Sequence, residues 1–334
     1  MSLSQAVLSQ DRLALSRLLT RVENDSEEGR VALNELFPHT GKAHLIGITG
    51  APGTGKSTLV NQLALYYRKA EKRVAIVAVD PSSPFTGGAV LGDRVRMRDL
   101  AGDPNIFIRS MASRGSLGGL AQTTAAVVQV FDAAGFDVIL IETVGAGQAE
   151  VDIARLAHTT LVIEAPGLGD DIQAIKAGIL EIADVLVVNK ADRQGVENTE
   201  RALRGLLELA HPAKRVFQHH GQRMVVEAPE MPNGLEAIWV PVIVRTIAKD
   251  GIGIDELGEK IARHVAFLRE GGEWVARERD QLRSTFDTLI RETLFRRFLD
   301  DLSPEGYAAM LSKMEARSLS PWEAVEILLN RKKL

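Results

Sequence analysis

The segment Gly47 to Val60 reads GITGAPGTGKSTLV and holds two glycines, a lysine and a serine at the spacing Gly-x-x-x-x-Gly-Lys-Ser. Glycines let the backbone turn its N–H groups around phosphate oxygens, and the free N–H groups of a following helix add donors. The lysine then reaches the outer phosphates, and the serine hydroxyl is a ligand for Mg²⁺. We therefore expect a nucleoside triphosphate and Mg²⁺ to bind here. The expected contacts come from Gly53, Thr54, Gly55, Lys56, Ser57 and Thr58.

The residues on either side supply the strand and the helix that such a loop needs. HLIGIT is a short apolar run typical of a buried strand, and KSTLVNQLALYYRKA has apolar residues at helical spacing. A glycine-rich turn that binds nothing is the alternative, but the Lys-Ser pair at the helix start favours a phosphate site.

Three acidic residues follow strand-like runs or glycine-rich loops. Asp80 ends RVAIVAVD, Asp93 lies in FTGGAVLGDRVRM, and Glu142 ends FDVILIE. Ligands of doubly wound sheets bind beyond the carboxyl ends of the strands, and Mg²⁺ prefers oxygen ligands. We predict that Ser57, Asp80, Asp93 and Glu142 surround the metal. The alternative is that Asp80 caps the turn DPSSP and Asp93 caps the helix RVRMRDL.

The segment TVGAGQ after Glu142 suggests how the terminal phosphate is sensed. Glycine three positions after an acidic residue, here Gly145, can present its N–H to that phosphate. In switch GTPases a glutamine after this glycine orients the attacking water, but this chain has Ala146. We expect slow hydrolysis unless Gln148, an arginine or a partner compensates. The loops PFTGGAVLGD and GAGQAEVD are predicted switches, with ordinary surface loops as the alternative.

The tetrapeptide NKAD, Asn189 to Asp192, follows the apolar run DVLVV. A carboxylate at Asp192 accepts hydrogen bonds from the ring N–H and exocyclic amine of guanine, and adenine presents an acceptor at the first of these positions. Together with Asn189 and Lys190 it predicts GTP and GDP as ligands, with a strand-ending Asn-Lys turn as the alternative. Further contacts to the base are expected from Thr246, Ile247 and Ala248.

Strand-like and helical runs alternate from residue 44 onward, which predicts an α/β fold with a mostly parallel, doubly wound sheet. We expect N-terminal helices over 1–40, a P-loop GTPase domain over 41–270, and a C-terminal helical extension over 271–334. The expected strands lie in HLIGIT, RVAIVAVD, IFIRSM, FDVILIE, TTLVIEA, DVLVVNK and AIWVPVIV.

Composition limits the class of protein. The 334 residues are 45% hydrophobic and 25% charged and contain no cysteine, which excludes disulfides and thiolate metal sites. A net charge of −4 gives no reason to expect nucleic-acid binding. No apolar run reaches membrane-span length and no signal peptide is evident, so we expect a cytoplasmic protein without membrane partners.

Taken together, the motifs resemble the MeaB and methylmalonic aciduria type A family of GTPase chaperones for adenosylcobalamin-dependent acyl-CoA mutases. The resemblance covers residues 40–268 and depends most on VDPSSPFTGGAVLGDRVRM, ETVGAGQAE and GDDIQAIKAGILEIADVLVVNKAD. It implies an acyl-CoA mutase as partner, with GTP controlling delivery of adenosylcobalamin, and a homodimer through C-terminal helices. The stripe Leu289 to Leu299 could form that dimer or pack on the chain's own core. Together with the motifs above, the residues that we expect to act in hydrolysis are Lys56, Asp93, Glu142, Gly145, Gln148 and Lys176.

The role of Lys176, in an additional mobile loop, comes only from this resemblance. The family usually reads ETVGVGQSE where this chain has Ala146 and Ala149, which could retune hydrolysis. Two alternatives are a transport-associated ATPase or kinase and a nickel-insertion GTPase. Asp192 argues against an ATPase, and the lack of cysteine argues against a metal store, for which His211, His219 and His220 would be the candidates.

Overall fold

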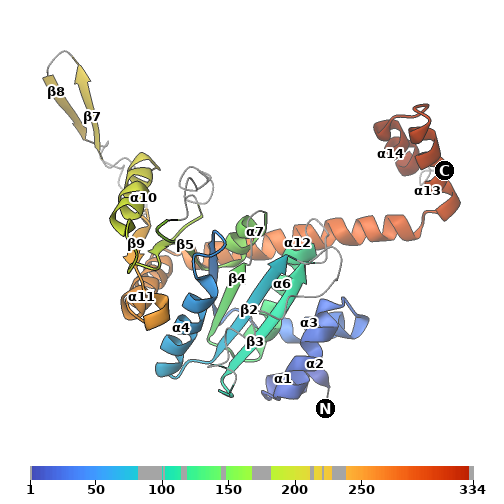
Figure 1. Ribbon diagram of the computed structural model, residues 1–334. Coiled ribbons are helices and arrows are strands. Elements are labelled where there is room, and N and C mark those ends of the chain that lie inside the picture. The colour runs from blue at the N-terminus through green and yellow to red at the C-terminus, as the bar shows by residue number, and fades with distance from the viewer. Residues whose placement is uncertain are drawn as a thin grey trace. The chain divides into compact units, whose positions relative to one another are not determined.

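The computed structural model describes residues 2–81, 100, 102–113, 119–143, 148–167, 182–210, 214–219, 222–227 and 238–330. At its centre is a seven-stranded sheet with the order β3-β2-β4-β1-β5-β6-β9, in which every neighbouring pair is parallel (Figure 1). The predicted α/β fold is confirmed. Its strands are β1 (His44–Gly50), β2 (Val74–Pro81), β3 (Ile106–Ser113), β4 (Val138–Thr143), β5 (Thr159–Glu164), β6 (Val185–Val188) and β9 (Val242–Arg245).

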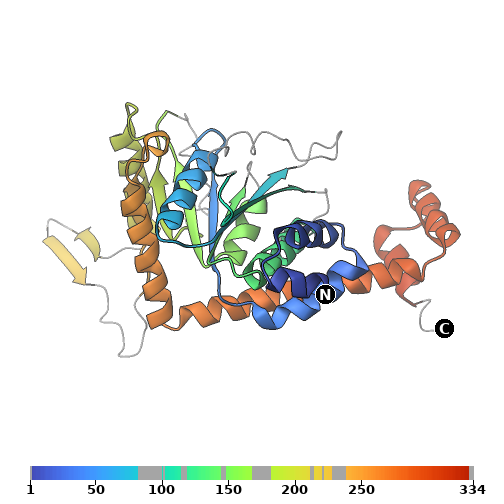
Figure 2. The ribbon, with the colours of Figure 1, turned by 90° about the horizontal axis from the view of Figure 1, so that it is seen from below.

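Helices cover both faces of the sheet (Figure 2). Alternate residues of a strand point to opposite faces, so Leu45 of β1 joins one buried cluster and Ile46 joins the other. The Leu45 cluster includes the N-terminal helices and α6, and the Ile46 cluster includes α4 and α11. The helices of this part are α1 (Leu3–Leu8), α2 (Arg12–Glu23), α3 (Glu27–Leu36), α4 (Lys56–Lys69), α6 (Gly119–Ala133), α7 (Gln148–Leu156), α10 (Val196–Ala210) and α11 (Ile254–Glu270), with short 3₁₀ turns η1 (Phe37–His39) and η3 (Ala248–Asp250).

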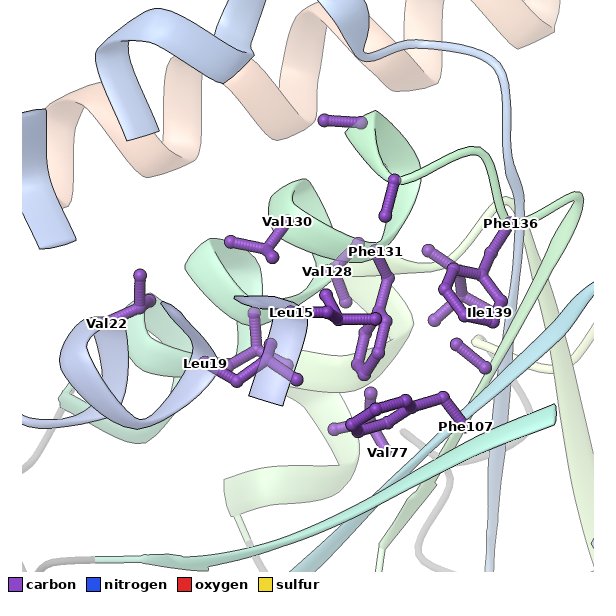
Figure 3. Packing of buried hydrophobic residues seen from close by; sticks show 14 of the residues in the cluster. Leu15, Leu19, Val22, Val77, Phe107, Val128, Val130, Phe131, Phe136 and Ile139 are labelled. Carbon is purple, nitrogen blue, oxygen red and sulfur yellow. The ribbon is translucent and has the colours of Figure 1, made fainter. Parts of the chain in front are cut away.

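Helix α2 packs on α6 through an apolar face (Figure 3). Phe131 of α6 lies at the middle of this cluster, with ring centroids 5.5 Å from Phe107 and 5.3 Å from Phe136. The buried carboxylate of Asp132, next along α6, accepts the backbone N–H groups of residues 41–43 at 2.5 to 3.1 Å. The chain is thereby held where it leaves the N-terminal helices and enters β1.

All seven strands expected from the sequence are present, but the last begins later than predicted. Pro241 has no N–H to donate to the ladder, and β9 begins after it, at Val242. A two-stranded antiparallel sheet was not predicted: β7 (Lys214–His219) pairs with β8 (Gln222–Glu227). Of the three histidines considered as metal ligands, only His219 is among the described residues.

Three histidines lie at the amino-terminal edge of the sheet. His44 Nε2 is 2.9 Å from Thr159 Oγ1, and that hydroxyl is 3.0 Å from His264 Nδ1. The ring of His158 stacks on Trp274, with 4.0 Å between centroids. Burial lowers the pKa of His44 to about 3, helped by the neighbouring His158. Burial likewise lowers the pKa of His158 to about 3.

The C-terminal part of the chain is helical. By its contacts the chain divides into Met1–Leu282 and Arg283–Leu334, and helix α12 (Glu273–Asp300) has residues in both. Helices α13 (Pro304–Glu315) and α14 (Pro321–Asn330) each begin with the proline of a Ser-Pro pair. The domain limits 1–40, 41–270 and 271–334 stay a prediction. In the described residues, no helix is long and apolar enough to span a membrane.

We expect the free energy of unfolding to fall between about pH 7.5 and about pH 5.5. His44 and His158 remain neutral in the folded protein because their pKa values are about 3, whereas the unfolded chain takes up protons below about pH 6.5. The contribution of these histidines to the free energy of unfolding is therefore fully present above about pH 6.5 and is lost as the pH falls. Between about pH 7.5 and about pH 5.5 the loss is about 1.4 kcal/mol per histidine. Urea titrations at the two pH values measure it.

The control compares two variants. His158→Gln removes one of the proton uptakes and should reduce the pH dependence, while His39→Gln alters an exposed histidine and should leave it unchanged. An equal pH dependence in wild type and His158→Gln would contradict the assignment.

Candidate nucleotide site

The phosphate loop predicted between β1 and α4 has a backbone that glycine alone adopts easily. Gly50, Gly53 and Gly55 have φ values of 142°, 82° and 95°. At Gly50 a Cβ atom would lie 2.1 Å from the carbonyl oxygen of Ile163 in the neighbouring strand β5. The loop therefore needs glycine for two reasons: its backbone angles are ones that other residues rarely adopt, and at Gly50 the neighbouring strand leaves no room for a side chain.

Lys56 is the first residue of α4, and its ammonium lies over its own loop. Nζ donates to the carbonyl oxygens of Gly50 at 2.7 Å and Ala51 at 3.0 Å, and the residue is only 7% exposed. These contacts hold a buried positive charge at the loop that the sequence assigns to phosphates. An anion that binds there meets this charge as well as the start of a helix.

Ser57 and Glu142 are brought together from segments 85 residues apart. The Ser57 hydroxyl donates to Glu142 Oε1 at 2.7 Å, and both residues are buried. The contact follows from the sheet order, because β4 is the parallel neighbour of β1 and Glu142 lies opposite Ile48. A hydroxyl beside a carboxylate is an oxygen donor set that suits Mg²⁺.

The other predicted metal and catalytic residues are only partly described. Asp80 lies near the carboxyl end of β2, two positions past the residue paired with Glu142, so its backbone lies at the same edge of the sheet. Gln148 is the first residue of α7. Asp93, Gly145 and Lys176 lie outside the described residues, and the roles predicted for all five stay predictions.

The side chain of Asn189 connects the phosphate loop to the segment after β9. Its Nδ2 donates to the carbonyl oxygen of Thr54 at 2.8 Å, and its Oδ1 accepts from Thr246 Oγ1 at 3.1 Å and from the N–H of Ala248 at 3.0 Å. Asn189 is 2% exposed. One buried amide thus uses both of its ends to join the two loops predicted to contact phosphate and base.

Lys190 makes a second connection. Its backbone has a φ of 57°, and its Nζ donates to the carbonyl oxygen of Gly53 at 2.5 Å. The first two residues of NKAD therefore hold the phosphate loop, and the turn that Lys190 makes leads the chain on to Asp192.

Asp192 lies at the surface of this edge, 37% exposed, with Lys249 Nζ 2.8 Å from its Oδ2. The hydrogen bond from Lys249 lowers the pKa of the Asp192 carboxyl, so that it is an anion at neutral pH and accepts hydrogen bonds. Lys249 was not predicted from the sequence. The available signal was its position, directly after the expected base contacts Thr246 to Ala248.

A family model described as methylmalonyl-CoA mutase-associated GTPase MeaB matches residues 15–303 of this chain. The chain belongs to the MeaB family. The resemblance that the motifs indicated is confirmed, and this MeaB-family protein is a GTPase.

Relatives of the MeaB-family chain support the assignment. A protein of Pyrococcus horikoshii named as a GTPase is 42% identical over 321 residues, covering 96% of this chain and 94% of the relative. The GTPase ArgK of Escherichia coli is 32% identical over 308 residues, covering 91% and 92%. The mitochondrial methylmalonic aciduria type A homolog of Mus musculus is 33% identical over 285 residues, covering 85% and 64%.

One solved structure shows the same fold over nearly the whole length. The crystal structure of a LAO/AO transport system kinase has a TM-score of 0.69 with this MeaB-family chain at 24% identity, covering 99% of this chain and 97% of that one. At this identity the likeness concerns the fold alone.

We expect Gly50→Ala to abolish GDP and GTP binding and to lower the melting temperature, because the new Cβ would overlap the Ile163 carbonyl oxygen. Gly205→Ala, in α10, is the matched control: its Cβ meets nothing within 4 Å, and it should leave binding unchanged. Calorimetric titration with GDP and a thermal melt measure both variants. Wild-type affinity in Gly50→Ala would show that the loop does not need this conformation.

We expect Asp192→Asn to weaken guanine nucleotides and to favour xanthine nucleotides. The amide offers an N–H donor where xanthine carries a carbonyl oxygen in place of the guanine amine. Competition of GTP, XTP and ATP against a fluorescent GDP analogue gives the order of affinities. Equal affinity of the unaltered protein for ATP and GTP would contradict the assignment of the base.

Proposed function

We propose that this MeaB-family GTPase is a nucleotide-controlled chaperone that gates adenosylcobalamin delivery to an acyl-CoA mutase and protects the enzyme. The observation that carries the proposal is the family match over residues 15–303, whose description names association with methylmalonyl-CoA mutase. The similarity to the mouse methylmalonic aciduria type A homolog supports it. Methylmalonyl-CoA mutase or a close relative is the proposed partner, in the cytoplasm.

In the proposed site, Lys56 and the backbone of Gly53 to Thr58 hold the phosphates of GTP or GDP. Asn189, Lys190 and Asp192 with Thr246 to Ala248 hold the guanine. The contact of Ser57 with Glu142 places two of the proposed Mg²⁺ ligands together, and Asp80 and Asp93 complete the proposed set. Bound Mg²⁺ would neutralise charge that develops on the phosphates during hydrolysis.

The proposed switching mechanism uses the segments that follow β2 and β4. Asp80 and Glu142 lie close to the ends of these parallel neighbours, so both strands end beside the proposed phosphate site. Contacts to the terminal phosphate through Gly145, with Gln148 and Lys176 assisting hydrolysis, would differ between GTP and GDP. A ligand shifts its partner only through such differential contacts.

A homodimer is part of the proposal. No side chain of helix α12 is fully buried, and several large apolar residues on it are exposed. Where such residues form a patch, they mark an interaction site. Among the described residues of the C-terminal unit, 283–330, the large apolar residues that are exposed are Phe286, Leu289, Ile290, Leu294, Phe295, Leu299, Tyr307, Leu311, Trp322, Val325, Ile327 and Leu329.

We expect the purified chain to bind an adenosylcobalamin-dependent acyl-CoA mutase and to transfer cobalamin to it in a nucleotide-dependent way. Size-exclusion chromatography with light scattering measures the mass of the free chain and of the complex. Cobalamin absorbance follows loading with GTP, GDP and a non-hydrolysable GTP analogue.

Asp192→Asn with xanthine nucleotides is the control, because the same transfer should then follow XTP and no longer GTP. The chaperone function is wrong if no acyl-CoA mutase binds, or if the three nucleotides give identical loading and release. A GTPase with another partner would remain.

A further inference from the structure

Arg277 of α12 binds the ends of β5 and β6 that lie farthest from the nucleotide site. Its Nη1 donates to the carbonyl oxygen of His158 at 2.7 Å and to Asp184 Oδ2 at 3.1 Å, and its Nη2 donates to Asp184 Oδ1 at 3.0 Å. His158 directly precedes β5 and Asp184 directly precedes β6. One guanidinium therefore joins the starts of two adjacent parallel strands, in a bidentate geometry that lysine cannot reproduce.

The Asp184 carboxylate is almost enclosed, with a side chain only 9% exposed. Oδ2 also accepts the N–H of Thr160 at 2.8 Å, and His264 Nε2 is 3.2 Å from Oδ1. Burial opposes ionisation of this carboxyl, but the adjacent His264 ring and the hydrogen-bonded Arg277 guanidinium outweigh it and lower its pKa. The Asp184 carboxylate is therefore an anion, and Arg277, His264 and the N–H of Thr160 fix its orientation.

The start of α12 is held against the same edge by an aromatic stack. Trp274, one helical turn before Arg277, stacks on His158 with 4.0 Å between ring centroids, and the Arg269 guanidinium lies 4.9 Å from the Trp274 centroid. Side chains three positions apart share a face of a helix, so Trp274 and Arg277 act on the sheet together. This part of α12 lies within the unit Met1–Leu282.

The opposite ends of the same two strands carry the nucleotide loops. Asn189 follows β6 directly, and its N–H donates to the carbonyl oxygen of Glu164, the last residue of β5, at 2.8 Å. The carbonyl oxygen of Ile163 in β5 limits the space at Gly50. Both strands are buried along their whole length, and an extended strand of four to six residues spans about 13 to 20 Å without freedom to shorten.

We propose that Arg277 is a positioning residue for guanine nucleotide binding. By holding the starts of β5 and β6 in one register, it sets the position at which Asn189 meets the phosphate loop. The start of α12, a helix that continues into the C-terminal unit, is thereby coupled to the nucleotide site. This proposal requires the GTPase activity but not a mutase partner, so it stands or fails separately from the chaperone function.

Arg277→Met tests the proposal, with Arg279→Met, at an exposed arginine two residues along the helix, as the control. We expect Arg277→Met to raise the dissociation constant for GDP and the KM for GTP about tenfold, a usual size for coupling between sites. The value of kcat should change little, because Lys56, Ser57 and Glu142 are untouched. Arg279→Met should match the wild type in all three quantities.

Loss of Arg277 alone leaves the buried Asp184 charge without its main partner, which could unfold the chain. The double variant Asp184→Asn, Arg277→Met removes both charges and should recover much of the melting temperature. We expect its GDP affinity to remain reduced, because the strand ends are still not joined to α12. A folded double variant with wild-type GDP affinity and KM would overturn the proposal.

Hydrogen exchange gives an independent measurement on the unaltered protein. Coupling between two sites is reciprocal, so GDP must slow exchange at the start of α12 if that segment assists GDP binding. We expect amides of residues 273–278 to exchange more slowly with GDP, and the effect to vanish in Arg277→Met. Identical exchange of this segment with and without GDP would overturn the proposal.

Discussion

The carboxamide of Asn189 is the interaction on which the arrangement of the nucleotide site depends. It donates to the loop after β1 and accepts from the segment after β9, so it joins two loops that come from strands three places apart in the sheet. Burying an amide costs little free energy when both of its ends are hydrogen-bonded. If one partner is missing, the unpaired polar atom carries the full desolvation penalty. Asn189, the loop after β1 and the segment after β9 therefore hold one another in position.

Both edges of the sheet are organised by polar side chains, and they differ in character. At the carboxyl edge Lys56, Ser57 and Glu142 provide a cation, a hydroxyl and a carboxylate around a glycine-rich loop, which is an arrangement that can receive phosphate and a divalent ion. At the amino edge Asp184 and Arg277 are paired with each other. The carboxyl-edge groups can bind a ligand, whereas the charges of Asp184 and Arg277 at the amino edge neutralise each other.

Much of the fold was readable from the sequence, because a parallel sheet covered on both faces needs continuous apolar strands. The seven predicted strands are present, and the glycine positions of the phosphate loop have the conformations that the motif requires. The hairpin β7–β8 was not predicted, since KRVFQHHGQRMVVE does not alternate cleanly between polar and apolar residues. The late start of β9 depends on a single proline whose effect is local.

The sequence by itself determined the chemistry of the site, because a motif such as GAPGTGKS or NKAD specifies donors and acceptors through residue types at short spacing. Only the tertiary structure decided which distant groups meet. The contacts of Ser57 with Glu142, of Lys249 with Asp192 and of Arg277 with Asp184 join segments 57 to 93 residues apart. Their formation depends on the strand order and on where η3 and α12 begin. These positions follow from burial of apolar surface over the whole chain.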